Sequence, residues 1–456
     1  MIRIDASTLS RLLGDWADAD ASLPEALARG IRDVIDAGLL PAGSALPSQR
    51  ALASALGISR GTVTAAIAVL TARGVVVSTQ GSGSRIRSGP GAGHLHEGRM
   101  FSFTSSPRDV IDLSTGALPA SCVARAVLRE PVPDVAEYLH TDGYFPAGLP
   151  VLRNAIAHYL TDQGVPTRPE QVLVTSGAQH GTHLALSEIL RPGDLALTED
   201  PSYRGGLAAL RQLGARVEGI PLRDGGLDVD LVHAAARRGP ALLYCQTSIH
   251  NPSGTTMAAP ERQRLASVIN RHGLVTVEDA CSRDLTLSGR PAEALATLVE
   301  PDLLVMVGTF SKLFWGGIRI GWLRAVPWRI AAFLERRQVT DLACSITDQL
   351  YAVHMLQRAS EAIAERTTML RRHLASTEAL LREHCPGWTW EPVRGGSGLW
   401  VDTGENSTCL AERAKRRNVR LVAGPAFSPH GGHPTRIRLP LWHEADHLGE
   451  ALGRIG

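Results

Sequence analysis

Short apolar runs alternate with helical segments from Val110 to the C-terminus, and this alternation constrains the fold more than any other feature of the sequence. Runs of four to six residues, rich in Val and Leu, are typical of strands buried on both faces of a parallel sheet. The runs are Gln171–Ser176, Leu195–Thr198, Ala241–Cys245, Leu274–Glu278 and Leu303–Val307. The pattern predicts an α/β fold in which helices cover a mostly parallel sheet.

Lys312 is the residue best suited to covalent chemistry. It is one of only two lysines, because 45 of the 47 basic residues are arginine. An ammonium group can lose its proton and attack a carbonyl, whereas a guanidinium effectively cannot. Ser311 precedes Lys312, and Arg319 follows in a glycine-rich loop. This combination predicts a Schiff-base site for pyridoxal 5′-phosphate (PLP); the alternative is a surface lysine, as expected for Lys415 on a charged helix face.

Further polar groups follow the predicted strands, where ligands gather in such sheets. The Ser176–His180 turn opens a helix, and its free amides suit a phosphate. Tyr203 can stack on a flat heterocycle, and Asn251 can donate to the phenolic oxygen of PLP. Asp279 can keep the pyridine nitrogen protonated. Each has an ordinary structural alternative: a helix turn, a buried ring, an Asn-Pro turn and a helix cap. In this order, ending at Lys312, they predict a PLP site.

The composition is that of a globular protein of two or three domains, with 456 residues, 44% hydrophobic and 20% charged. No apolar run reaches the roughly 18 residues of a membrane span, and the first residues lack a signal-peptide core. We therefore expect a cytoplasmic protein. The six cysteines lack CxxC spacing, which predicts reduced, buried thiols and neither disulfides nor a metal site.

Small residues and chain breakers mark a division in the chain. The segment 88–108 predicts a flexible linker, with an ordered loop packed on one domain as the alternative. The expected domains are therefore residues 1–87 and residues 109–456.

The N-terminal block has the outline of a winged helix-turn-helix. Apolar spacing predicts helices over 23–37, 48–56 and 60–73, and the runs 75–79 and 84–86 predict a hairpin. Between residues 23 and 87 there are seven arginines and three acidic residues, a balance of +4. This excess fits a surface that faces phosphates.

Three segments of this block, Leu46–Ala53, Leu56–Val63 and Gly81–Gly83, resemble the GntR-type DNA-binding domain. The resemblance implies that the helix after Ser59 enters the major groove and that the wing approaches the minor groove. The implied DNA contacts are Ser48, Arg50, Ser59, Arg60, Thr62, Gln80 and Gly81. A protein-docking module is the alternative.

Residues 107–456 resemble fold-type I PLP-dependent aminotransferases, through the ordered motifs that end at Lys312. The resemblance implies that Lys312 forms the internal aldimine and that Asp279 pairs with the pyridine nitrogen. It implies that Asn251 binds the phenolic oxygen and that Tyr203 stacks on the ring. The cofactor-binding residues implied at the phosphate end are Ser176, Gly177, Ala178, Ser311 and Arg319.

The resemblance also implies a shared site and a carboxylate contact. Tyr144 resembles the tyrosine that reaches the phosphate of a partner subunit, which implies a homodimer with shared active sites. Arg438 is assigned to the carboxylate of an effector, with Arg436 as its competitor, because a guanidinium pairs with a carboxylate through two hydrogen bonds. One departure is the absence of a tyrosine shortly after Asp279, where this chain has Cys281; the missing hydroxyl argues against efficient turnover, but not against cofactor binding.

The whole chain resembles the MocR (GabR-like) transcription regulators, in which a GntR-type head is fused to an aminotransferase-like domain. This implies a regulator that binds operator DNA and senses an amine or amino acid through aldimine chemistry at Lys312. Two alternatives stay open. One is a working aminotransferase that carries a DNA-binding head, and the other is a sensor of PLP itself.

Overall fold

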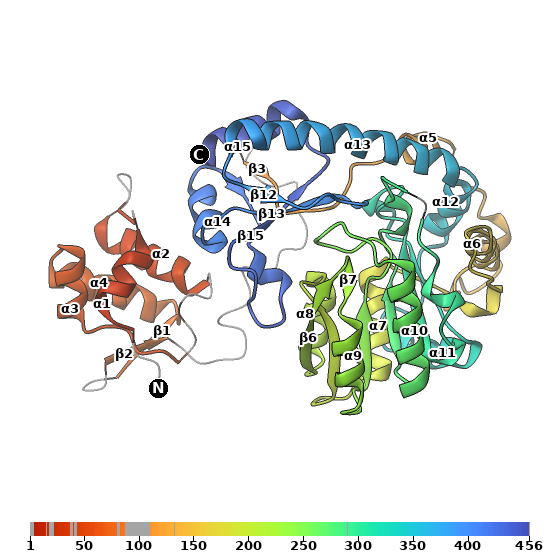
Figure 1. Cartoon of the computed structure of the whole chain (residues 1–456), viewed down its shortest axis with the longest axis horizontal. Helices are drawn as coiled ribbons and strands as arrows, with labels where there is room; N and C mark the ends of the chain where they lie inside the picture. The colour runs from red at the N-terminus through yellow and green to blue at the C-terminus, as the bar shows by residue number, and fades with distance from the viewer. Residues whose placement is uncertain are drawn as a thin grey trace. The chain divides into compact units, whose positions relative to one another are not determined.

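The computed structural model describes residues 4–14, 16–17, 22–36, 40, 43–79, 83–86, 110–131, 133–289 and 291–455. The chain divides into two compact units, residues 1–99 and residues 100–456, and each is described by itself (Figure 1). The expected linker, 88–108, lies outside the described residues.

The N-terminal unit has helices around a single core and a hairpin beside them. Its elements are α1 (Ala6–Leu13), α2 (Leu23–Asp36), α3 (Gln49–Leu56), α4 (Arg60–Ala72), β1 (Val76–Thr79) and β2 (Gly83–Ile86). Gly57 ends α3 at a φ of 65°, which favours glycine. Helices α3 and α4 then meet at a bend of 117°. A short glycine-containing turn between nearly perpendicular helices is the helix-turn-helix arrangement.

Helix α1 is an element that the apolar spacing did not predict. Asp5 begins it by accepting the Thr8 N–H at 2.9 Å. Leu9 and Leu13 then enter the same core as α2 and α4. With only two fully buried positions, such a short helix gives little periodic signal.

The larger unit is built on an eight-stranded sheet with the order β4-β11-β10-β9-β8-β5-β6-β7. Its strands are β4 (Val172–Thr175), β5 (Leu195–Asp200), β6 (Arg216–Arg223), β7 (Gly226–Leu227), β8 (Leu242–Cys245), β9 (Thr276–Asp279), β10 (Leu304–Thr309) and β11 (Gly321–Arg324). Strands β6, β5, β8, β9 and β10 run parallel, whereas β11 is antiparallel to both of its neighbours. The predicted α/β class is confirmed, and all five predicted runs are strands.

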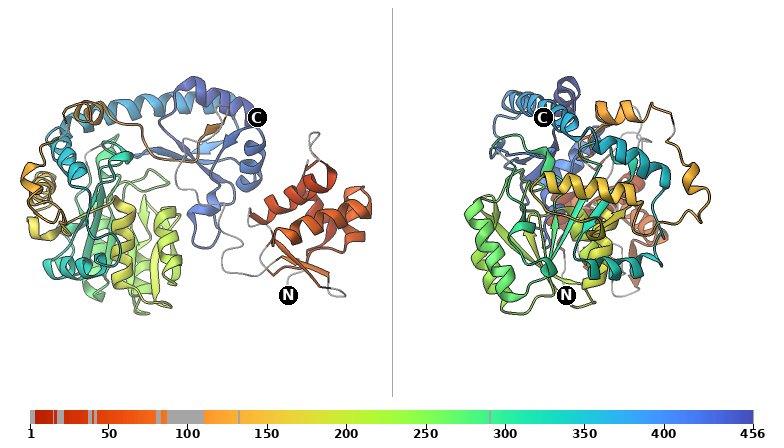
Figure 2. Two further views of the ribbon diagram at one scale, coloured as in Figure 1. Left: turned by 180° about the vertical axis from the view of Figure 1, so that it is seen from behind. Right: turned by 90° about the vertical axis from the view of Figure 1, so that its right-hand side faces the viewer.

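Helices cover both faces of this sheet (Figures 1 and 2). Leu197 and Leu243 pack with α9 and α10 on one face. Their neighbours Ala196 and Leu242 pack with α7, α8 and α11 on the other, because successive side chains of a strand alternate. These helices are α7 (Ala178–Ile189), α8 (Arg204–Gln212), α9 (Val229–Ala236), α10 (Ala259–His272) and α11 (Pro327–Arg337).

A second, smaller sheet lies toward the C-terminus of the same unit. It contains β12, β13 and β15 in antiparallel order, with α13, α14 and α15 packed on it. Helices α5, α6 and α12 form a further core with β4 and the loop after β10. The elements are α5 (Cys122–Val127), α6 (Pro150–Asp162), α12 (Ile346–Leu356), α13 (Ala359–His384), β12 (Thr389–Trp390), β13 (Gly398–Asp402), α14 (Ser407–Arg416) and β15 (Arg436–Pro440), with α15 (Ala445–Ile455) last.

The six cysteines are all free, but only Cys245 and Cys344 are buried as expected, and Cys281 and Cys385 are partly buried. Cys122 and Cys409 are exposed, because each lies in the first turn of a short helix with its side chain facing outward. Among the described residues, no single helix is long and apolar enough to cross a membrane, and α3 with α4 passes that test only as a bent pair.

Candidate functional site

Lys312 lies in the loop that joins β10 to β11, at the carboxyl end of the parallel strands. Its Nζ donates to the Gly116 carbonyl at 2.9 Å, and the residue is partly buried. Burial and the nearby Arg438 lower the pKa of Lys312 to about 8. A lower pKa leaves more of the amine neutral and nucleophilic near pH 7. Lys415 differs: its side chain is 58% exposed beside Glu412.

Asp279 ends β9 and is buried at the same edge of the sheet. Its Oδ2 accepts a hydrogen bond from the Tyr244 hydroxyl at 2.8 Å, and its Oδ1 accepts one from the Cys281 N–H at 3.0 Å. Burial and Asp279 hold the pKa of Tyr244 well above its ordinary value, so the phenol keeps its proton and donates. Tyr244 was not among the predicted site residues, although a tyrosine inside an aliphatic strand signals a buried hydroxyl that needs a partner.

Tyr203 immediately precedes α8, and its ring is held in place from two sides. The Tyr203 hydroxyl donates to Gln179 Oε1 at 3.2 Å, and Gln179 Nε2 donates to the Gly205 carbonyl at 3.0 Å. A Cβ at Gly205 would lie 2.5 Å from the Tyr203 ring, so only glycine fits there. Gln179 is a second residue that the motifs did not reveal.

Asn251 lies in the turn after β8, and its backbone is fixed by Gln246. The Asn251 N–H donates to Gln246 Oε1, and Gln246 Nε2 donates back to the Asn251 carbonyl, both at 3.2 Å. The Gln246 N–H in turn donates to the buried Glu199. Burial raises the pKa of Glu199 to about 8.

The start of α7, after β4, lies beside a cation. In the turn itself the Ser176 N–H donates to His180 Nδ1 at 3.2 Å. The predicted Gly177 N–H donates to the Thr175 carbonyl at 2.8 Å, so the free amides are those of the first turn of α7. Gly177 begins α7 at a φ of 88°, and no side chain caps that helix. Arg319 donates to the Ser176 carbonyl at 2.6 Å, and a Cβ at Gly177 would lie 2.7 Å from its guanidinium. Uncapped amides at the start of a 12-residue helix, next to an arginine, suit a phosphate group.

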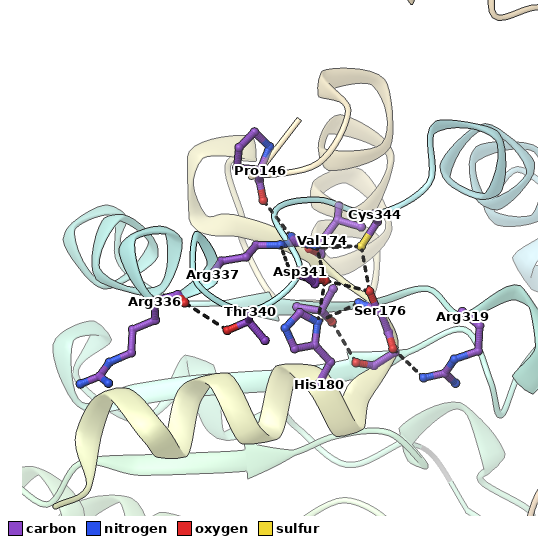
Figure 3. A network of polar contacts seen from close by, with 12 residues as sticks. Pro146, Val174, Ser176, His180, Arg319, Arg336, Arg337, Thr340, Asp341 and Cys344 are labelled. Carbon is purple, nitrogen blue, oxygen red and sulfur yellow. Dashed lines mark hydrogen bonds and ion pairs between the residues drawn. The ribbon is translucent and has the colours of Figure 1, made fainter. Parts of the chain in front are cut away.

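An ion pair between the buried Arg337 and the partly buried Asp341 lies beside this turn (Figure 3). Arg337 is fully buried, and its Nε and Nη2 donate to the Asp341 carboxylate at 2.8 and 3.1 Å. Asp341 then accepts the Ser176 hydroxyl at 3.1 Å and lies 3.5 Å from His180 Nδ1. The Ser176 hydroxyl therefore faces Asp341 in this structure, and its contact with a cofactor stays a prediction.

Arg438 enters the site from β15, and two of its donors have no partner. Its Nε and Nη2 are buried without a hydrogen bond among the described residues. Burial and the nearby Arg204 lower its pKa to about 9. A Cβ at Gly116 would lie 2.4 Å from Arg438 Nη1, so a glycine makes room for the guanidinium. The competitor Arg436 instead lies 3.4 Å from Asp402, partly exposed.

The remaining predicted residues of this unit lie apart or contribute their backbone. Tyr144 is 57% exposed, and its contact with a partner subunit stays a prediction. Ser311 is partly buried beside Lys312, and its N–H donates to Thr309 Oγ1 at 3.1 Å. Cys281 gives Asp279 a backbone N–H, and burial holds the pKa of its thiol well above the ordinary value, so the thiol stays protonated.

The N-terminal unit presents several of the predicted DNA contacts at the starts of α3 and α4. Ser48 and Ser59 accept the N–H groups of Ala51 and Thr62, so their hydroxyl oxygens cap these helices. The other predicted contacts described, Arg50 and Arg60, are exposed. Gln80 and Gly81 lie outside the described residues.

Comparisons with known proteins agree with this division of the chain. The family described as aminotransferase class I and II matches residues 108–455, and the gntR family of bacterial regulatory proteins matches residues 23–86. The probable rhizopine catabolism regulatory protein MocR of Rhizobium meliloti is 30% identical over 96% of this chain and 91% of its own length. The uncharacterized HTH-type transcriptional regulator YisV of Bacillus subtilis is 28% identical over 94% of each chain.

The fold of the larger unit is also that of a solved aminotransferase. The kynurenine aminotransferase of Pyrococcus horikoshii, solved in complex with PMP, has a TM-score of 0.70 and 26% identity, over 77% of this chain and 90% of that one. The groups described above fit such a cofactor: an amine of lowered pKa, a carboxylate held by two donors, and an uncapped helix N-terminus beside Arg319. Pyridoxal 5′-phosphate is therefore the cofactor of the larger unit.

Proposed function

The chain belongs to the aminotransferase class I and II family and to the MocR-like group of GntR-type regulators, and on that premise we propose that its binding to operator DNA responds to an amine or amino acid captured at Lys312. One observation carries the proposal. A partly buried amine, a buried carboxylate and an arginine with unpartnered donors lie together in the larger unit of a chain whose other unit is a helix-turn-helix.

Different residues of the larger unit would bind different parts of the cofactor and of the incoming amine. When bound, PLP supplies an aldehyde that can exchange one amine partner for another. Asp279 would hold a proton on the pyridine nitrogen, Asn251 would bind the phenolic oxygen, and Tyr203 would cover the ring. Arg438 would orient the carboxylate of the incoming ligand through its two unpartnered donors.

Release of Lys312 from the cofactor is the event that we propose to be transmitted to the DNA-binding unit. A freed ammonium beside Arg438 adds a positive charge to a buried site, so charge and packing change together. A ligand shifts such an equilibrium only by its different affinity for the two states. We further propose that the protein works as a homodimer, with Tyr144 completing the partner's phosphate site.

The decisive experiment measures DNA affinity in three states of the full chain. A duplex is first selected from a random library by the purified protein, and its affinity is then measured without PLP, with PLP, and with PLP plus each amino acid. We expect an amino acid to change the affinity of the PLP-loaded protein. An affinity that stays constant across all amino acids would rule out effector sensing, and a change on adding PLP alone would favour a sensor of the cofactor.

A transaminase is the second candidate, and the intact pair of Lys312 and Asp279 favours it. Steady conversion of an amino acid to its keto acid at roughly one turnover per second or faster would support this reading. Conversion far slower than that would leave ligand sensing as the function of the site.

Tyr244→Phe is expected to destabilise the cofactor-free larger unit by about 2 kcal/mol, because a buried carboxylate loses a hydrogen bond while the ring stays in place. The measurement is urea unfolding followed by fluorescence. The control is Tyr203→Phe, which removes a hydroxyl bonded to the neutral Gln179 and should cost about 1 kcal/mol. Equal losses in the two variants would argue against a special role for the bond to Asp279.

Arg60→Ala is expected to weaken binding to the selected duplex by about tenfold, because Arg60 is exposed at the first position of α4. The control is Arg73→Ala, which removes the same charge at the other end of α4 and should have little effect. Affinities measured at several salt concentrations check the prediction. If both variants bind equally well, the start of α4 does not contact DNA.

A further inference from the structure

Two arginines of the larger unit lie close together and are nearly inaccessible to solvent. Arg438 is 5% exposed and Arg204, the first residue of α8, is 9% exposed. Their guanidinium carbons lie 5.9 and 5.3 Å from the centre of the same ring, that of Phe427. Burial and Arg204 lower the pKa of Arg438, which is the effect of one buried cation on another.

Neither arginine forms an ion pair with a carboxylate among the described residues. Arg204 Nη2 donates only weakly, to the Ser114 carbonyl at 3.3 Å, and Arg438 has two donors without any partner. The acid that acts on Arg204, Asp112, is instead 3.5 Å from Arg420. Buried charges are normally paired, because removing an ion from water is costly. Two unpaired guanidinium groups therefore indicate that a ligand brings the negative charge.

Both arginines and Lys312 converge on one short segment. Arg204 donates to Ser114, and Lys312 Nζ donates to Gly116. A Cβ at Gly116 would meet the guanidinium of Arg438. A ligand whose amine replaces Lys312 on the cofactor thus lies within reach of both guanidinium groups. The phosphate of the cofactor would bind elsewhere, beside Arg319 and the start of α7, and would leave these two charges unmatched.

We propose that the effector is an α-amino acid with a second acidic group, whose α-carboxylate binds Arg438 and whose second acid binds Arg204. The proposal rests on the proposed function, since it names the class of ligand for the same site. A single carboxylate would neutralise only one of the two arginines. A dicarboxylic amino acid neutralises both, through charge-assisted hydrogen bonds.

The test compares ligands that differ in charge but hardly in shape. The PLP-loaded full chain is titrated with L-glutamate and L-glutamine, and with L-aspartate and L-asparagine. Affinity is read from the shift of the cofactor absorbance band and, independently, by calorimetry. We expect at least one acid to bind tenfold or more tightly than its amide. Equal affinity of acid and amide in both pairs would overturn the proposal, because the charge of the second acid would then contribute nothing to binding.

Substitutions at Arg204 test whether this residue causes the preference for the acid over its amide. Arg204→Gln should reduce the affinity for the acid about tenfold and the affinity for the amide much less, and Arg204→Lys should keep part of the preference by keeping the charge. Arg264→Gln removes an exposed arginine far along the chain and should leave the ratio unchanged. A full acid preference in Arg204→Gln would overturn the assignment.

The same titrations distinguish a wrong ligand class from a failure of ligand capture at Lys312. If amino acids shift the absorbance band without any preference for a second acid, only the ligand class is wrong. If no amino acid shifts the band, ligand capture at Lys312 fails, and the ligand class fails with it.

Discussion

Lys312→Ala should abolish the visible absorbance band of protein-bound PLP and, with it, every response of DNA binding to amino acids. No other lysine can replace it, because Lys415 lies exposed on α14 beside Glu412. The substitution removes a cation from beside the cationic Arg438, and the buried Asp279 carboxylate keeps its hydrogen bonds from Tyr244 and Cys281, so the fold should hold. DNA binding by the cofactor-free protein should be unchanged.

Two controls make this result specific. Lys415→Ala should keep the full absorbance band, since its side chain is 58% exposed and distant in sequence from the strand ends. Lys312→Arg keeps the positive charge but should also lose the band, because a guanidinium effectively cannot react with the aldehyde. A band that persists in either Lys312 variant would refute the assignment of the covalent residue.

Arg337→Ala should lower the free energy of unfolding of the larger unit by about 3 kcal/mol, the low end of the loss expected for a buried ion pair, because Asp341 is partly exposed. Arg337 is fully buried and bonds to Asp341, to the carbonyls of Pro146 and Val174, and to Cys344 (Figure 3). Removing Arg337 leaves the Asp341 carboxylate, which accepts the Ser176 hydroxyl, without its cationic partner. Denaturant unfolding measures the loss, and PLP titration measures the accompanying loss of affinity.

The neighbouring residue supplies the matched control. Arg336 lies on the exposed side of α11, and its backbone carbonyl accepts the Thr340 hydroxyl at 3.1 Å. Arg336→Ala should therefore change the free energy of unfolding by less than about 0.5 kcal/mol. A loss below about 1 kcal/mol for Arg337→Ala would mean that the pair contributes no more than a surface salt bridge.

The sequence predicted the strands that are continuous apolar runs, but not those whose residue types are mixed. All five apolar runs became strands, because only a continuous apolar run suits a strand covered on both sides. Strand β6 has a half-exposed pattern that contains Gly219 and Pro221, residues that are rare within strands. Strand β11 has only four residues and a single aliphatic side chain, Leu323.

The sequence predicted the reactive side chains of the candidate site. It did not predict the residues that hold those side chains in position. Lys312, Asp279 and Arg438 stand out because their types suit the reaction and follow strands or lie in one. Their supports have no local signal. Tyr244 lies within an apolar run, and Arg337 is one arginine among 45. The pairing of Ser176 with Asp341 joins residues 165 positions apart, which no local pattern reveals.

The antiparallel strand β11 has a consequence for the order in which the two units can form. It pairs with β4 on one side and β10 on the other, so the Ser176 turn and the Lys312 loop meet only after distant parts of the chain have come together. The helices of the N-terminal unit make their contacts within fewer than 90 residues. Chains with high contact order fold slowly, and chains with local contacts fold fast. A newly made polypeptide should therefore gain its DNA-binding head well before its ligand receptor, and PLP, which binds only the completed receptor, should act as a folding ligand that shifts the population toward mature protein.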